Sequence, residues 1–312
     1  MTEALATRRS PLESLGRIAT FTRVMYKPHY LLYGVLWVLA LEGTAALVSH
    51  PDIGWRPTGA TCARIAIVAI VLLYLRMVDE QKDLRYDRVH NPDRPLVTGA
   101  VDAGELRAAM AVIALVAVSA SLALSPASGA LIAVVLGYGL LLWGLERLSA
   151  TVRDRILLNL VVTYPVQLLV TAYVVCSAAD SGTAVVTARA AAVALIFAGA
   201  FLQFEFARKT SRDVRPGELL YSNALGTGGS IAASLLLATG AVAADIAVVR
   251  PWELDGAATV IGCIPVALLL IPFASAARFL RSRERDYPVV PPVLFILALY
   301  LTLIAQAVAG TA

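Results

Sequence analysis

The sequence predicts an all-α, polytopic membrane protein with about nine transmembrane helices and a cytoplasmic N-terminus. Hydrophobic residues make up 59% of the 312 positions and charged residues only 15%, and the mean hydropathy is +0.75. This composition is typical of integral membrane proteins. The apolar residues fall into runs of about 20, the number of helical residues that crosses roughly 30 Å of hydrocarbon. The basic residues gather at one end of these runs.

The N-terminal segment, residues 1–29, is the first element along the chain. Its stretch SPLESLGRIATFTRVM predicts a short amphipathic helix, because Ser10 can cap it, Pro11 suits its first turn and Glu13 completes a capping box. We expect this helix to lie along the cytoplasmic membrane interface; the alternative is a frayed tail. No cleavable signal peptide is expected, because the first apolar run begins only near Tyr30.

The predicted spans follow one another with only short polar connections. We therefore expect a single integral membrane domain over residues 1–312. Small residues in the later spans, as in GTGGSIAAS, favour close packing of helices in lipid. The spans are expected at about 30–49, 59–78, 103–124, 127–145, 156–178, 187–207, 220–242, 257–277 and 289–309.

Positive charge is distributed unevenly between the two ends of the spans. With the N-terminus inside, 22 of the 26 Lys and Arg residues fall on the cytoplasmic side, which is a strong positive-inside signal. An odd number of spans then places the C-terminus outside. The net charge of +4 needs no nucleic-acid partner for its explanation. The excess of Arg over Lys, with abundant Ala, suggests a GC-rich bacterial genome, so a bacterial cell membrane is the expected location.

An acidic segment, DEQKDLRYDRVHNPDRPLVTG, directly follows the second span. Its residues Asp79, Asp83 and Asp87, here called the first stripe, recur every four positions and share one face if the helix continues. Like charges four residues apart repel one another, so a cation is expected among them. No cysteine or histidine cluster joins the stripe, and an all-oxygen ligand set suits Mg²⁺. The alternative is a solvated helix end paired with Lys82, Arg85 and Arg88.

A second stripe ends the sixth span within FLQFEFARKTSRDVRPGE. Glu205, Lys209 and Asp213 again recur every four residues, at the same predicted side of the membrane. The two spans are four apart, so the chain is interpreted as two related four-helix units plus one helix. Repeated units in membrane proteins often hold the site at their interface, and charges at the membrane edge indicate function.

The first stripe resembles the first signature of the UbiA superfamily of intramembrane prenyltransferases. That signature is Asn-Asp-x-x-Asp-x-x-x-Asp, followed by a basic residue and later by Arg-Pro. The stretch YKPHY is similar to the family's N-terminal Arg-Pro-His, with Lys27 in the basic place. The residues that match the first signature are Asp79 in the Asn position, Asp83, Asp87, Arg88, Arg94 and Pro95.

The second stripe departs from the family's second signature, which is Asp-x-x-x-Asp. Lys209 stands where one aspartate is expected, Asp213 is retained, and Glu205 lies one turn earlier. A charged lysine cannot bind Mg²⁺ but can hold a phosphate as a point charge. We therefore expect fewer metal-binding carboxylates on this side, with direct contact between Lys209 and the diphosphate.

The resemblance implies Mg²⁺-dependent transfer of a prenyl group, within the membrane, from a prenyl diphosphate to a lipophilic or aromatic acceptor. It implies that Asp83, Asp87 and Asp213 are catalytic. The expected metal ligands are Asp79, Asp83, Asp87, Glu205 and Asp213. The expected diphosphate-binding residues are Lys27, Arg88, Arg94, Arg153, Lys209 and Arg212.

Three further polar residues are expected to line a substrate pocket. Asn159 and Tyr164 lie inside the fifth span, and Tyr221 begins the seventh beside the second stripe. Asn159 could orient an acceptor or a phosphate, and the π face of Tyr164 could stabilise a carbocation. Hydrogen bonding between helices is the alternative role, and Arg153 has the alternative of an ordinary positive-inside residue.

Two other functions are left open. A terpene cyclase of the same superfamily would use the same site, with the ionised chain attacking itself. A cation-coupled transporter would bind cations at the repeat interface, but transporter sites lie near the bilayer midplane, and both stripes lie at one membrane side. Release of pyrophosphate separates an enzyme from a transporter, and omission of the acceptor separates a cyclase from a transferase.

Overall fold

The computed structural model describes residues 10–51 and 53–309, and within them the predicted all-α architecture is confirmed. Nine helical segments of this part of the chain are long and apolar enough to cross a membrane. Two of these segments consist of two helices each. The spans are α2 (Pro28–Ser49), α3 (Gly59–Lys82), α6 (Ala103–Leu124), α7 (Pro126–Leu148), α9 with α10 (Ile156–Thr163, Pro165–Asp180), α11 (Ala188–Arg208), α12 (Tyr221–Val249), α13 with α14 (Gly256–Leu268, Leu270–Arg281) and α15 (Val290–Ala309).

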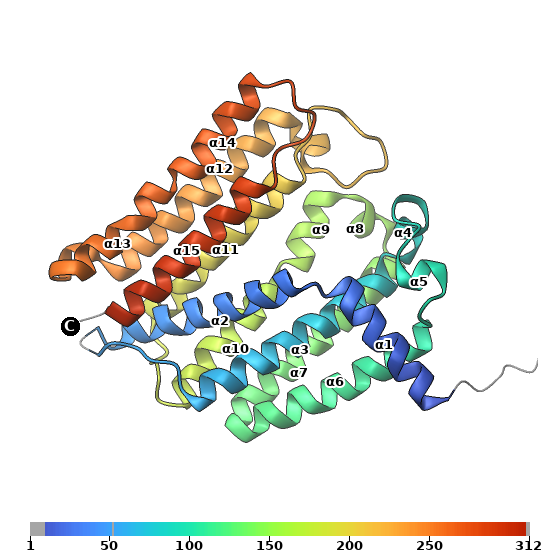
Figure 1. The fold of residues 1–312 in the computed structure, drawn as a ribbon, viewed down its shortest axis with the longest axis horizontal. Helices are drawn as coiled ribbons and strands as arrows, with labels where there is room; N and C mark the ends of the chain where they lie inside the picture. The colour runs from blue at the N-terminus through green and yellow to red at the C-terminus, as the bar shows by residue number, and fades with distance from the viewer. Residues whose placement is uncertain (1–9, 52, 310–312) are drawn as a thin grey trace, which may run out of the picture.

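The remaining helices are short and lie near the ends of the spans. They are α1 (Pro11–Met25), α4 (Leu84–His90), α5 (Pro95–Thr98), α8 (Ala150–Asp154) and the 3₁₀ turn Pro251–Glu253. Helices α3, α6 and α7 lie in the lower part of Figure 1 and α11 to α15 in the upper left, with α2 running between the two groups. The first and last spans, α2 and α15, pack side by side, as do α11 and α12. Their shared core contains the fully buried side chains of Leu41, Val68, Phe197 and Leu299.

Three spans bend where their sequence requires it. The fifth breaks at Tyr164, because the following Pro165 has no N–H for the helix ladder and its ring disturbs the preceding turn. Pro272 explains the break at Leu269 between α13 and α14 in the same way. In α12, Gly226 has φ +71°, a conformation that costs other residues free energy, and the helix kinks there.

The amphipathic helix α1 is confirmed from Pro11 onward, with the expected capping box between Ser10 and Glu13. Arg17 joins it to α6 through a 2.6 Å ion pair from its guanidinium to Glu105. Its side chains Leu12 and Leu15 are exposed, which fits a helix lying on a membrane surface. Residues 1–9 of the predicted N-terminal segment lie outside the described residues.

A buried ion pair crosses from α2 to α3 near the opposite end of the bundle from α4 and α8. Glu42 and Arg64 are both fully buried, with Arg64 Nε 2.8 Å from Glu42 Oε2. Thr61 donates a further hydrogen bond to Glu42, and Arg64 donates to the Ser177 carbonyl. Because each charge is compensated by its partner, we assign this pair to the packing of the helices.

Candidate active site

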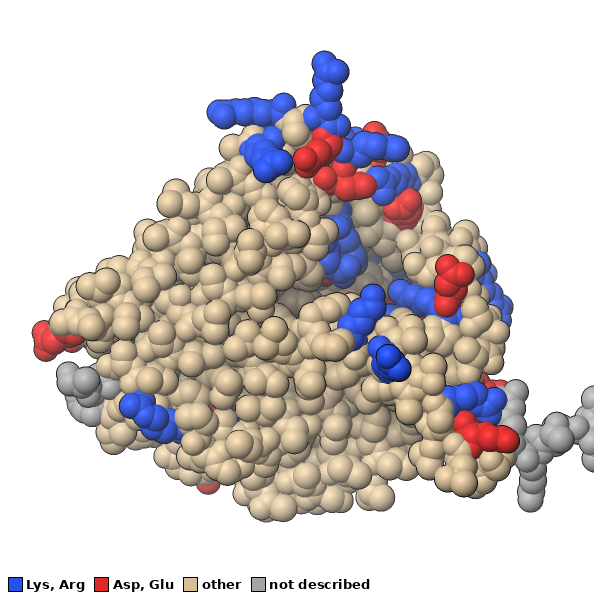
Figure 2. All heavy atoms as spheres, viewed as in Figure 1, with Lys and Arg blue, Asp and Glu red and all other residues tan. Residues whose placement is uncertain are grey.

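A cavity of about 1690 Å³ opens among α3, α4, α7, α9, α11 and α12. Charged side chains gather around a hollow on the face shown in Figure 2, whereas the rest of that face is largely uncharged. The inner wall is apolar and aromatic, with Leu75, Trp143, Val166 and Phe201 among its residues. The cavity therefore combines a charged mouth with an interior suited to a hydrocarbon chain.

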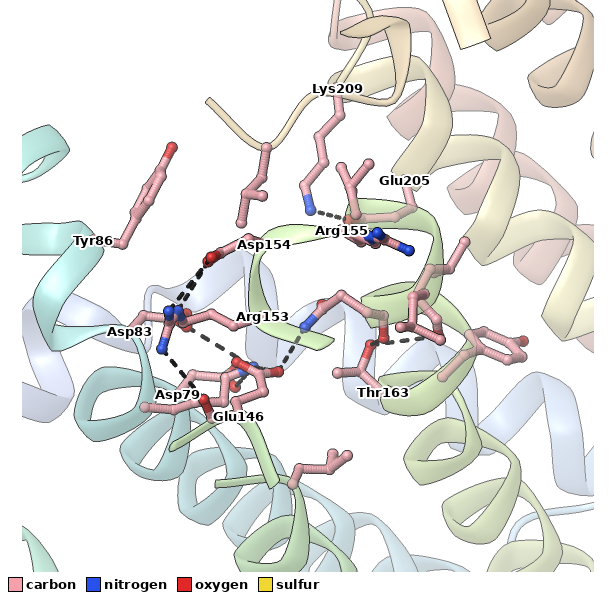
Figure 3. A pocket seen from close by; sticks show the side chains of 18 of the residues that line it. Asp79, Asp83, Tyr86, Glu146, Arg153, Asp154, Arg155, Thr163, Glu205 and Lys209 are labelled. Atoms are coloured by element: carbon pink, nitrogen blue, oxygen red, sulfur yellow. Dashed lines mark hydrogen bonds and ion pairs between the residues drawn. The ribbon is translucent and has the colours of Figure 1, made fainter. Parts of the chain in front are cut away.

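The first stripe bends at the mouth of this cavity. Helix α3 ends at Lys82, and Asp83 joins it to α4, so the aspartates occupy two consecutive helices instead of one. The carboxylates of Asp79 and Asp83 remain 47% and 39% exposed. Both line the cavity on the same side as Glu146, as Figure 3 shows. They are therefore the carboxylates of the stripe best placed to meet a cation.

Glu146 joins this cluster from α7 and was not predicted. Its side chain is only 4% exposed and accepts hydrogen bonds from Lys82 Nζ at 3.1 Å and from Asn159 Nδ2 at 2.7 Å. Lys82 Nζ also lies 3.5 Å from Asp79 Oδ1 and 3.9 Å from Asp83 Oδ1. One sequence signal for Glu146 exists, because it is an acidic residue at the inner end of the fourth predicted span.

The electrostatics of Asp83 reflect this crowding. Burial, together with the neighbouring Asp79 and Glu146 charges, raises the pKa of the Asp83 carboxyl to about 7, while Lys82 opposes the shift. Carboxylates that raise one another's pKa disfavour the ionised state. A bound cation reverses that preference, so this side of the mouth is suited to binding positive charge.

Asp87, the third member of the first stripe, is held by its own chain. The carboxylate is buried and receives hydrogen bonds from Asn91 Nδ2 at 2.8 Å and from Arg94 Nη1 at 2.5 Å. Arg94 Nη1 also contacts Glu80 Oε1 at 3.0 Å. Both Asp87 and Arg94 line the cavity, yet their charges are directed at each other.

The second stripe forms the opposite side of the mouth. Glu205 Oε2 accepts from Arg208 Nε at 2.6 Å, and Glu205 Oε1 lies 2.7 Å from Lys209 Nζ. The Lys209 ammonium also lies 5.4 Å from the centre of the Tyr221 ring. One carboxylate against two cations leaves a net positive charge here, which suits a phosphate and not a metal ion.

Asp213 does not share the helical face that the spacing predicted. Helix α11 ends at Arg208, because the next residues pair with a distant segment: Tyr287 N donates to Thr210 O at 3.0 Å. Asp213 therefore lies in a loop, with its carboxylate 2.6 Å from Arg285 Nε, and it is not among the cavity-lining residues. Arg212 donates to the backbone carbonyl groups of Ser282 and Glu284.

The structure brings most of the predicted site residues to one cavity. Lys27, Arg88, Arg212 and Asp213 are not among its lining residues, and Lys27 and Arg88 are exposed. The predicted residues that line the cavity are Asp79, Asp83, Asp87, Arg94, Arg153, Asn159, Tyr164, Glu205, Lys209 and Tyr221.

The predicted pocket residues of the fifth span, Asn159 and Tyr164, lie on α9 and at the break between α9 and α10. Asn159 on α9 donates a hydrogen bond to the buried Glu146, which joins α9 to α7. Tyr164 lies at the break, deeper in the cavity, with its ring 6.3 Å from that of Phe201. Arg153 pairs with the adjacent Asp154, with 2.9 Å from Arg153 Nε to Asp154 Oδ1.

The fit to Mg²⁺ differs between the first side of the mouth, formed by Asp79, Asp83 and Glu146, and the second side, formed by Glu205 and Lys209. No preformed cluster of three metal-binding side chains is found among residues 10–51 and 53–309. Asp79 and Asp83 nevertheless present accessible carboxylate oxygens to the cavity, and Mg²⁺ is commonly held by one or two carboxylates plus substrate phosphates. The first side therefore fits one divalent cation. Glu205, with two cationic partners, does not fit a second.

Fold and site define a polytopic helical protein with a charged site at one end of the bundle. Its fold is similar to those of solved UbiA homologues. An apo UbiA homologue from Aeropyrum pernix K1 has 22% identity and a TM-score of 0.56, covering 87% of this chain and 96% of that chain. No family model matches the sequence, and no curated protein matches it.

Two further solved structures share the fold at lower identity. A UbiA homologue from Archaeoglobus fulgidus bound to DMAPP and Mg²⁺ has 13% identity and a TM-score of 0.60, covering 93% of this chain and 99% of that chain. A digeranylgeranylglyceryl phosphate synthase has 13% identity and a TM-score of 0.57, covering 94% of this chain and 99% of that chain. The fold implied by the sequence resemblance is thereby confirmed.

Proposed function

We propose that this protein is a prenyltransferase that moves a prenyl group from a prenyl diphosphate to a lipophilic or aromatic acceptor, with Mg²⁺, inside the membrane. The observation that carries the proposal is the division of charge at the cavity mouth. Asp79 and Asp83 lie on one side of it and Glu205 with Lys209 on the other (Figure 3), above an apolar interior. A diphosphate that carries a hydrocarbon tail is complementary to both parts.

The two sides of the mouth have different roles in this proposal. Asp79 and Asp83 would hold Mg²⁺, which when bound neutralises charge on the diphosphate. Lys209 binds the phosphate oxygens as a fixed positive charge and stabilises the negative charge that develops as the C–O bond breaks, while Arg208 neutralises Glu205. Asp87 and Arg94 support the first side through their ion pair. Asp213 stays outside the proposed set, because it is paired with Arg285 away from the cavity.

The interior of the cavity is suited to the allylic cation that ionisation produces. Leu75, Trp143 and Val166 exclude water from the chain, and water would otherwise capture the cation. The rings of Tyr164 and Phe201 line the same space, where a cation over a ring face is stabilised by attraction to the ring quadrupole. An acceptor bound in this interior then forms the new bond and loses a proton.

The decisive experiment supplies the purified protein with Mg²⁺ and a panel of prenyl diphosphates, with and without aromatic and lipid acceptors. We expect pyrophosphate release that depends on an acceptor, and a prenylated acceptor identified by mass spectrometry. Cyclised hydrocarbon or alcohol products without an acceptor would instead identify the terpene cyclase. No pyrophosphate release with any substrate, in protein shown to be folded, would contradict both enzymatic functions and favour the transporter.

We further propose that the protein resides in a bacterial cell membrane with this site at the cytoplasmic side. In a cysteine-free background, single cysteines replacing the exposed residues Thr98 and Val214 are expected to react with an impermeant maleimide only from the cytoplasmic side. A cysteine replacing Trp252, which is exposed at the other end, is expected to react from outside. Labelling of Thr98 and Trp252 positions from the same side would contradict this topology.

A further inference from the structure

Lys82 occupies a central position among three carboxylates at the cavity mouth. Its ammonium nitrogen lies 3.1 Å from Glu146 Oε1, 3.5 Å from Asp79 Oδ1 and 3.9 Å from Asp83 Oδ1. The Lys82 side chain is only 11% exposed and that of Glu146 only 4%, so bulk water screens this pair weakly. An ammonium in such surroundings occupies a place that a metal ion could otherwise take.

Lysine is rare in this chain, which makes its placement informative. Only Lys27, Lys82 and Lys209 are present among the 26 basic residues. Lys82 and Lys209 lie on opposite sides of the same cavity, each against a carboxylate of its own side. An ammonium is a compact point charge, whereas a guanidinium is a planar fork, so lysine is the side chain that most closely resembles a small metal cation.

The net charge of the first side of the mouth indicates how many divalent cations it can bind. With Asp79, Asp83 and Glu146 ionised, three negative charges face the single positive charge of Lys82, and two negative charges remain. One divalent cation neutralises that remainder. The nearest contact of Lys82 is the buried Glu146, whereas Asp79 and Asp83 keep oxygens accessible from the cavity.

We infer that Lys82 is a built-in cation of the site, which takes the place of one metal ion and limits the protein to a single divalent cation bound by Asp79 and Asp83. Glu146 is the positioning residue that anchors the Lys82 ammonium, and Asn159 orients Glu146 through its 2.7 Å hydrogen bond. The inference rests on the proposed diphosphate site but not on the nature of the product.

The test counts bound Mn²⁺ by electron paramagnetic resonance, with full-length protein in detergent and inorganic pyrophosphate present. We expect one Mn²⁺ per wild-type chain and two in Lys82→Met, because the lost positive charge is replaced by a second metal ion. Lys82→Arg, which retains the charge, is expected to bind one. Arg17→Met, which frees a single carboxylate at Glu105 far from the cavity, is the matched control and is expected to bind one.

A second pair of variants keeps the test valid if Lys82→Met does not fold with Glu146 unpaired. Glu146→Gln leaves one net negative charge at the site, and the double variant Lys82→Met with Glu146→Gln leaves two without burying an unpaired charge. We expect Mn²⁺ to bind the double variant at least about tenfold more tightly than it binds Glu146→Gln, because the nearby ammonium is gone.

Equal Mn²⁺ affinity in Glu146→Gln and in the double variant would overturn the inference. Two Mn²⁺ ions bound to the wild type, or only one bound to a folded Lys82→Met protein, would also overturn it. These outcomes are independent of turnover. A protein that shows the expected Mn²⁺ numbers but transfers no prenyl group would support the inference and contradict the proposed function. The reverse pattern, prenyl transfer with an unchanged metal count in Lys82→Met, would contradict only the inference.

Discussion

Replacing Asp83 with asparagine is expected to lower turnover at least about a hundredfold, the scale of losing one strong electrostatic contact in a closed site. The substitution removes a carboxylate charge with almost no change in volume. Asp83 faces the cavity beside Asp79, and burial together with the neighbouring carboxylates disfavours its charged form. The measurement is the rate of pyrophosphate release from a prenyl diphosphate at saturating Mg²⁺.

The matched control for this variant is Asp255→Asn. Asp255 is an exposed aspartate at the other end of the bundle, so its replacement is expected to leave turnover within about twofold of the wild type, as is usual for surface changes. EDTA is expected to abolish the wild-type activity. Full activity in EDTA, or normal turnover in Asp83→Asn, would show that the first side does not act through a metal ion.

Replacing Lys209 with methionine is expected to weaken binding of the diphosphate by about 1.5–3 kcal/mol, the range for a charge-assisted hydrogen bond. Methionine keeps much of the side-chain length and removes the charge. Lys209 lines the cavity and is the one basic residue of the second stripe that faces both Glu205 and the Tyr221 ring. Inhibition by inorganic pyrophosphate is expected to weaken by the same amount.

Arg208→Met is the informative comparison, because Arg208 is the other cationic partner of Glu205. If Lys209 served only to neutralise Glu205, then either substitution would have the same small effect on pyrophosphate inhibition. A larger loss in Lys209→Met than in Arg208→Met therefore indicates direct contact with the diphosphate. Unchanged inhibition in a folded Lys209→Met protein would rule that contact out.

Much of the fold could be predicted because it depends on local properties of the chain. The nine spans follow from runs of apolar residues long enough to cross a bilayer, and the structure confirms them within the described residues. Helix α1 follows from the Ser10, Pro11 and Glu13 pattern, whose capping interactions all lie within one turn. The break at Tyr164 was not predicted, although its cause, the Pro165 ring, is equally local.

The site was predictable only in part. Asp79 and Asp83 were singled out because their spacing within one segment is regular, and both line the cavity. Glu146 was missed because its approach to Lys82, 64 residues away, depends on the packing of α7 against α3 and leaves no spacing in the sequence. Asp213 was placed on a helix that ends before reaching it.

By itself, the sequence determined that the chain is helical, that it has nine membrane-length spans, and that acidic and basic residues gather at one end of them. Hydrophobic burial in lipid, helix capping and proline geometry act over a turn or a span, so residue order is sufficient to predict them. Tertiary structure alone decided which charges meet. It placed Lys82 among Asp79, Asp83 and Glu146, and it turned Asp213 toward Arg285, because charge pairing over a few ångströms depends on how separate helices and loops pack.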